Sequence, residues 1–182
     1  MTELDSWVIY WRDHTERTYL YGAEILFHSK VHIEYRNNLM PPGTVIKSWQ
    51  SKYNYQMDKL EPSLPMIDGE SDYVIKTDID CNKESGWLLR LVFFDKFGAE
   101  ADSLIIRDAE APFKCPLKTY YYRLDLLGAG ATEIHFHSIT ISEVSYEEDE
   151  RPEKASEKAG SGKKLRKQNK KSDRRGTGGK NR

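Results

Sequence analysis

The apolar residues of this chain come in short clusters that are rich in β-branched and aromatic side chains and are separated by turn-forming residues. This pattern is typical of strands, and its repetition along the chain is typical of a sandwich or barrel. No stretch has helical periodicity over the length of a stable helix. The sequence therefore predicts an all-β chain that folds as an antiparallel β-sandwich of jelly-roll type. We expect its strands at 7–11, 19–28, 31–36, 44–55, 72–80, 87–95, 103–107, 119–127 and 132–145.

The last of these strands changes its alternation part of the way along. Ile134 and Phe136 share one parity, whereas Ile139 and Ile141 share the other. Because side chains alternate strictly between the faces of a regular strand, both pairs reach the core only if one residue is inserted between them. The pattern predicts a β-bulge near Ser138.

The composition of the chain changes abruptly after Tyr146, which is the last aromatic residue. Beyond it Leu165 is the one large aliphatic side chain, too little apolar surface to offset the entropy of ordering the segment. The sequence therefore predicts a β-sandwich domain at 1–146 and a disordered charged tail at 147–182.

Charge divides the tail further. Residues 147–150 are all acidic, and 160–182 holds ten Lys or Arg and one Asp, a net charge of +9. Because the whole chain carries −1, the first 159 residues carry −10. A basic segment binds nucleic acid or anionic lipid through salt-sensitive contacts, but this one lacks the aromatic residues that stack on bases. We expect a solvated tail with no specific nucleic-acid partner, and contact with anionic lipid stays open.

Candidate binding residues lie in the proline-rich stretch from 39 to 69. In an extended strand over 44–57 the odd positions share a face, which carries the four candidates for partner or substrate binding: Lys47, Trp49, Tyr53 and Tyr55. Two interpretations stay open for the aromatic side chains. They form the core side of a half-buried strand, or they form an exposed platform that stacks on sugars or lines a groove for a peptide.

No catalytic motif is present in the chain. It has no G-x-S-x-G elbow, no H-E-x-x-H helix and no phosphate loop with its lysine. Gly128–Ala131 is rich in small residues, but strands flank it on both sides, which predicts a hairpin turn. We therefore expect a protein that is not an enzyme and that has no cofactor.

Metal ligands are also sparse along the sequence. His135 and His137 share a strand face, but no third ligand is near them in sequence, which favours a polar outer face. Asp95–Gly98 is predicted as a hairpin turn rather than a calcium loop. We expect no metal site. The remaining histidines carry no pattern: His14, His28 and His32.

Two cysteines, Cys81 and Cys115, are too few for a disulfide scaffold and lack metal-ligand spacing, which indicates free thiols in a reducing compartment. The apolar run at 7–11 is too short for a signal-peptide core or a membrane span. We expect the protein in the cytoplasm, with contact at the inner face of the membrane through partners.

Several stretches taken together carry a family resemblance. They are NNLMPPGTVIKSWQSKYNYQ at 37–56, PSLPMIDG at 62–69 and Tyr73, with Tyr19–Gly22, Leu91–Gly98, Phe113–Pro116, Leu126–Gly130 and Ile134–Ile139. In their order and spacing the chain resembles the third of the accessory Sec system proteins of Gram-positive bacteria, from about Trp7 to Val144.

The resemblance implies a fold similar to that of carbohydrate-binding modules and a non-catalytic role as an adaptor or chaperone. The implied partners are the two sister accessory Sec proteins, the accessory SecA motor and the glycosylated serine-rich repeat adhesin that this system exports. Direct contact with glycan stays open. The alternative is a free-standing carbohydrate-binding module, which would use Trp49, Tyr53 and Tyr55 as its stacking residues.

Overall fold

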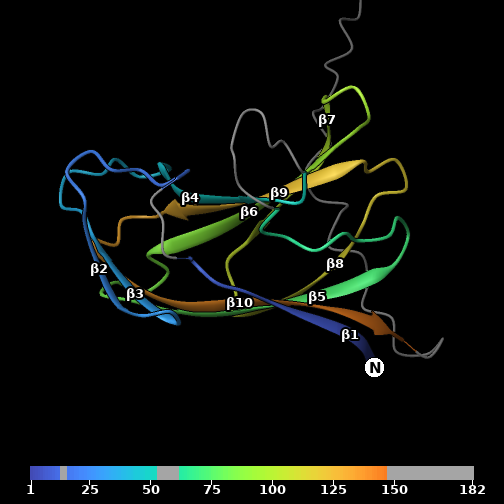
Figure 1. The fold of residues 1–182 in the computed structure, drawn as a ribbon, viewed down its shortest axis with the longest axis horizontal. Helices are drawn as coiled ribbons and strands as arrows, with labels where there is room; N and C mark the ends of the chain where they lie inside the picture. The colour runs from blue at the N-terminus through green and yellow to red at the C-terminus, as the bar shows by residue number, and fades with distance from the viewer. Residues whose placement is uncertain (13–15, 53–61, 147–182) are drawn as a thin grey trace, which may run out of the picture. The chain divides into compact units, whose positions relative to one another are not determined.

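The computed structural model describes residues 1–12, 16–52 and 62–146, and in these ranges the chain is all-β with no helix. Two antiparallel sheets lie face to face as a sandwich (Figure 1). The predicted fold class is therefore confirmed. The domain boundary at Tyr146 stays a prediction, because the tail at 147–182 lies outside the described residues.

The first sheet has six strands, in the order β2-β3-β10-β5-β8, with β1 also paired to β10. The long β10 pairs with β5 along one edge, and its other edge is shared by β3 at Glu133–Phe136 and by β1 at Ile139–Ser145. The strands of this sheet are β1 Thr2–Ile9, β2 Glu24–Ser29, β3 His32–Arg36, β5 Asp72–Cys81, β8 Glu110–Lys114 and β10 Glu133–Ser145.

The second sheet has four strands, in the order β4-β9-β6-β7. All of its neighbours are antiparallel. Its strands are β4 Val45–Gln50, β6 Trp87–Phe94, β7 Glu100–Ile106 and β9 Tyr121–Gly128.

The core between the sheets is rich in aromatic side chains. The Trp11 ring meets Trp49 edge-on at 6.3 Å between centroids, and Trp49 stacks on Phe136 at 5.4 Å. Alternation explains the rest of the core, because inward positions on β6 and β9 are leucines or aromatics while outward positions include arginines. Each buried aromatic removes a large apolar area from water, so these contacts dominate the stability of the sandwich.

The bulge predicted near Ser138 is confirmed. The pairing of β10 with β5 shifts register between Phe136 and Ser138. The inserted residue turns Ile139 and Ile141 into the core. It also leaves both His135 and His137 on the outer face of the first sheet, which matters for the site described below.

Three local predictions differ from the structure. β8 was not predicted, because Pro112 interrupts it; a proline is tolerated there because β8 is an edge strand. β1 begins earlier than predicted, at Thr2, because its polar first residues pair with the end of β10. The hairpin predicted at Gly128–Ala131 is wrong, since β9 and β10 lie in different sheets and this segment connects them.

Candidate binding surfaces and a histidine cluster

Trp49 lies in the core. Its side chain is 1% exposed, and its indole Nε1 donates to the Tyr10 carbonyl at 3.0 Å. Both faces of the ring are therefore taken by protein contacts, as the core interpretation holds, and neither is open to a ligand. Tyr53 and Tyr55 lie outside the described residues.

Lys47 is also buried, at 1% exposure. A register shift between Val45 and Lys47 inserts a residue into β4, so Ile46 and Lys47 are both buried despite their opposite parity. The Lys47 Nζ donates to the Glu16 carbonyl at 2.9 Å and lies 5.5 Å from the centre of the Trp11 ring. Burial lowers the pKa of Lys47 to about 8. Its contacts place it as an anchor between the 16–19 segment and β4.

The edge of β4 is covered by that same segment. The Tyr19 amide donates to the Ile46 carbonyl at 2.8 Å, and the Ser48 amide donates to the Arg17 carbonyl at 3.1 Å. Among the described residues, the outer edges of β2, β7 and β8 have no partner strand. Pro112 removes one backbone donor from β8, which leaves β2 and β7 as the better templates for pairing with another chain.

A charged network lies on the outer face of the second sheet, centred on Asp125, which is 1% exposed. Arg90 Nη2 donates to its carboxylate at 2.8 Å and Arg123 Nε at 3.1 Å, and the Ser48 hydroxyl donates to it as well. The Arg123 guanidinium also lies over the Phe94 ring at 5.4 Å. A buried carboxylate with this many donors is an organised structural element of the sheet surface.

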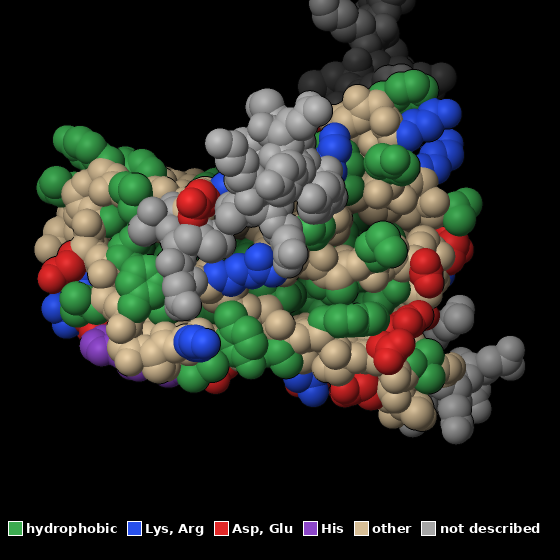
Figure 2. Space-filling view, in the orientation of Figure 1, with side chains coloured by type: hydrophobic (Ala, Val, Ile, Leu, Met, Phe, Trp, Pro, Cys, Tyr) green, Lys and Arg blue, Asp and Glu red, His purple; other side chains and the backbone are tan. Residues whose placement is uncertain are grey.

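The histidine cluster lies on the outer face of the first sheet. Four of the five histidines come together there, on β2, β3 and β10: His28, His32, His135 and His137. The rings of His28 and His137 each lie 4.6 Å from the His32 ring, so the three form a stack. Figure 2 shows histidine side chains at the lower left edge of the molecule, where Figure 1 places β2 and β3.

A chain of ion pairs and hydrogen bonds joins the histidines to acidic residues. Glu34, which is 4% exposed, pairs with His28 Nε2 at 2.7 Å and also with Arg36. Arg36 reaches Glu133 at 3.6 Å, and Glu133 pairs with His135. The hydrogen bond from His28 and the charge of Arg36 lower the pKa of the Glu34 carboxyl. This half of the cluster already contains its own balancing cation.

The other half of the cluster contains two aspartates from β5. Carboxylate oxygens of Asp78 and Asp80 and a ring nitrogen of His137 all lie within 4.8 Å of one another. Glu34, Glu133 and His135 form a second group of the same kind. Sequence reasoning missed the cluster because it depends on the pairing register of β3, β10 and β5, which no local pattern reveals.

An apolar surface is formed by two neighbouring loops, the β6–β7 turn and the β8–β9 connection. We call Phe97, Leu117 and Tyr120 the apolar loop surface; they are 84%, 70% and 70% exposed. They line an open hollow together with Asp95, Lys96, Lys118 and Thr119. Exposed apolar clusters of this kind are typical of protein interaction sites.

The turn that presents Phe97 is well ordered by hydrogen bonds. The Asp95 carboxylate accepts from the amides of Phe97 and Ala99 at 2.8 and 3.0 Å, and Gly98 has a φ of 84°. The predicted hairpin turn at Asp95–Gly98 is therefore confirmed. Because the carboxylate caps its own turn, the loop holds Phe97 outward in a fixed position.

Taken together, the chain is a β-sandwich whose described surface offers an apolar loop surface, two open strand edges and a histidine–carboxylate cluster. No helix in the described residues is long and apolar enough to cross a membrane. A family model described as the accessory Sec secretory system ASP3 matches residues 18–143. The chain belongs to this family.

Curated relatives agree with the family assignment. The accessory Sec system protein of that name from Streptococcus gordonii is 35% identical over 127 residues, which cover 70% of this chain and 80% of the relative. The one from Staphylococcus aureus (strain NCTC 8325 / PS 47) is 24% identical over 149 residues, which cover 82% of this chain and 46% of the relative. The chain therefore spans about half of the longer relative.

Solved structures are similar as well. A chain in the crystal structure of accessory secretory protein 1, 2 and 3 in Streptococcus pneumoniae is 29% identical with a TM-score of 0.73, and the match covers 80% of this chain and 99% of that one. A chain in the Glycosylation Associate Protein (Gap123) complex from Streptococcus agalactiae has a TM-score of 0.73 at 24% identity, over 84% of this chain and 49% of that one. The second likeness shows the fold alone.

Proposed function

We propose that this protein is the third subunit of an accessory Sec complex and acts there with two sister accessory proteins. The observation that carries the proposal is the Streptococcus pneumoniae structure, which contains the three accessory secretory proteins together. The similar chain in it is covered almost completely, at 99%. A surface that serves the assembly in that relative therefore has a counterpart in this chain.

The role in the complex is that of a non-catalytic adaptor. In the described parts of the chain, no serine or cysteine side chain is hydrogen-bonded to a histidine, which is the arrangement an activated nucleophile needs. The histidines instead contact carboxylates and one another. This pattern supports binding rather than covalent chemistry.

The apolar loop surface is the docking site for a sister protein. Its three large side chains are exposed in the isolated chain, and burying such side chains favours association by roughly 1.5–3 kcal/mol each. The ordered Asp95 turn fixes Phe97 beforehand, which reduces the entropy cost of binding. Lys96 and Lys118 beside it supply a polar rim.

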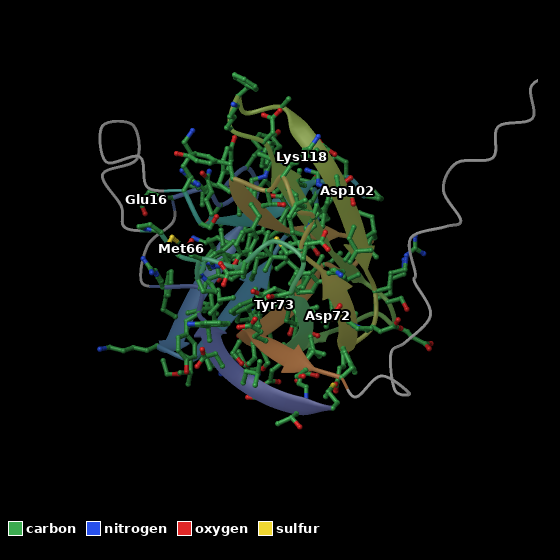
Figure 3. The ribbon with its side chains drawn as sticks, turned by 90° about the vertical axis from the view of Figure 1, so that its right-hand side faces the viewer. Glu16, Met66, Asp72, Tyr73, Asp102 and Lys118 are labelled. Carbon is green, nitrogen blue, oxygen red and sulfur yellow. The ribbon has the colours of Figure 1, made fainter. Side chains whose placement is uncertain are left out.

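Single substitutions test this docking site. Phe97→Asp should weaken capture of the sister proteins by at least tenfold, because it places a charge at the centre of the contact. Met66→Asp is the matched control, since Met66 is equally exposed, at 89%, and lies away from Lys118 of the loop surface (Figure 3). Equal capture by both variants would place the docking site elsewhere.

The cargo of the complex is the serine-rich repeat adhesin, delivered to the accessory SecA motor at the cytoplasmic face of the membrane. An extended serine-rich chain suits the open edges of β2 and β7, where main-chain hydrogen bonds are available for strand addition. Deletion of the gene should leave adhesin inside the cell, and the wild-type chain should restore export. Undiminished export after deletion would refute this role.

A free-standing sugar-binding module has no comparable support. That alternative used Trp49, Tyr53 and Tyr55 as stacking residues. Trp49 is in the core, and the two tyrosines lie outside the described residues, so no described side chain of this set favours it.

A further inference from the structure

We propose that Asp78, Asp80 and His137 bind a divalent transition-metal ion on the outer face of the first sheet. A ring nitrogen and two carboxylate oxygens from these residues all lie within 4.8 Å of one another. This site is distinct from the apolar loop surface and goes beyond the proposed adaptor role. It also revises the expectation, based on sequence alone, that the chain holds no metal.

Sheet register brings the three side chains to one place. Asp78 and Asp80 are two residues apart on β5, so they share its outer face, and both are exposed. Across the ladder, Asp80 pairs with His135 and Asp78 pairs with Ser138. The bulge inserts His137 between these two partners. Both strands lie in the interior of the sheet, so the backbone that carries the three ligands is rigid.

The ring of His137 is held in place by its neighbours. It stacks on His32 at 4.6 Å between centroids with 21° between the planes. His32 in turn stacks on His28, and its Nε2 lies 3.2 Å from Nδ1 of His135. Contacts that orient an imidazole in this way are the usual support for a metal ligand.

The two acidic groups of the cluster differ in what already balances them. Arg36 pairs with both Glu34 and Glu133, so that group holds a cation of its own. Within the described ranges, neither Asp78 nor Asp80 has an ion pair or a side-chain hydrogen bond. Two carboxylates this close repel each other, and a cation between them removes the repulsion. The metal therefore belongs to the aspartate group.

The donor set indicates the class of ion. One imidazole with two carboxylates suits Zn²⁺ and its transition-metal neighbours, whereas Ca²⁺ and Mg²⁺ prefer oxygen ligands alone. Bond lengths of about 2.0–2.2 Å put tetrahedral ligand atoms roughly 3.4 Å apart, which exposed aspartate side chains reach by small rotations. Three protein ligands leave the fourth position to water.

Titration calorimetry with Zn²⁺ on the full-length chain, prepared without a histidine tag, tests the site. We expect one saturable equivalent and a rise in the unfolding temperature, because an ion that bridges β5 and β10 binds only the folded chain. His137→Gln and Asp80→Asn should each weaken binding by at least tenfold. Glu133→Gln, in the group balanced by Arg36, should keep wild-type affinity.

Other outcomes would overturn the proposal. They are the absence of saturable binding, unchanged affinity in both His137→Gln and Asp80→Asn, or an equal loss in Glu133→Gln. A second measurement uses Co²⁺, whose visible absorption should indicate four-coordination in the wild type and should be missing in Asp80→Asn. Circular dichroism of each variant checks that it is folded, and the exposed Asp80 provides a test even if His137→Gln does not fold.

Discussion

Replacing Lys47 with methionine should change how the stability of the protein depends on pH. Burial lowers the pKa of Lys47 from 10.5 to about 8, although its Nζ donates to the Glu16 carbonyl and to the Thr18 hydroxyl. A fall of this size corresponds to about 3 kcal/mol, at about 1.4 kcal/mol per pKa unit. The folded protein therefore bears a cost for keeping this lysine charged.

The pH window follows from the depressed pKa. Below pH 8 the lysine is charged in the folded and the unfolded state, so its cost to stability is constant. Between pH 8 and 10.5 it is neutral in the folded state but still charged in the unfolded state, so the unfolded state binds more protons. The free energy of unfolding of the wild type should therefore rise by about 3 kcal/mol across this window, relative to Lys47→Met.

Urea unfolding followed by tryptophan fluorescence at several pH values measures the effect. Only the change in the difference between wild type and Lys47→Met matters, so any constant loss from the missing hydrogen bonds drops out. Burial raises the pKa of Tyr35, Tyr73 and Tyr122, but these side chains are present in every variant and cancel. Lys30→Met, at an exposed position, should give a curve parallel to the wild type. If Lys47→Met is parallel as well, the burial of Lys47 carries no electrostatic cost and the reasoning is wrong.

Three further predictions concern the core, the sheet surface and the tail. Trp49→Ala should lower the free energy of unfolding by about 3–5 kcal/mol in urea titration, because it leaves a large cavity, whereas Tyr21→Ala, at 72% exposure, should change it by less than about 0.5 kcal/mol. Asp125→Asn should cost about 3–5 kcal/mol by the same measurement, since two arginines lose their buried carboxylate; a loss below about 1 kcal/mol would contradict the network. Truncation at Asp149 should change stability by less than about 0.5 kcal/mol, and trypsin should remove the tail first; a destabilised body would show that the domain boundary at Tyr146 is wrong.

Much of the fold could be predicted because most strands carry a strong local signal. The alternation of β5 and the continuous apolar run of β6 follow from their burial on one or both faces. The bulge in β10 could be predicted because a change of parity within one strand has a single simple cause. In contrast, β8 was missed because its proline argues against a strand unless the strand is known to lie at an edge.

The candidate sites were harder to predict because they depend on contacts between distant parts of the chain. Lys47 reads as an exposed residue, and its burial follows from a bulge in β4 and a covering segment that come from tertiary structure. His32 and His135 are separated by most of the chain, yet their ring nitrogens lie 3.2 Å apart. Pairing register between β3 and β10 creates this contact, and a single sequence does not specify register between such distant strands.

Size-exclusion chromatography with light scattering, on this chain mixed with its two sister accessory proteins, tests the central claim most directly. The account predicts one co-eluting species whose mass contains all three subunits. The Phe97→Asp variant should elute apart from that species, and Met66→Asp should remain in it. Elution of the wild-type chain alone at its own mass of 21.2 kDa, beside sister proteins that are folded and bound to each other, would contradict the account.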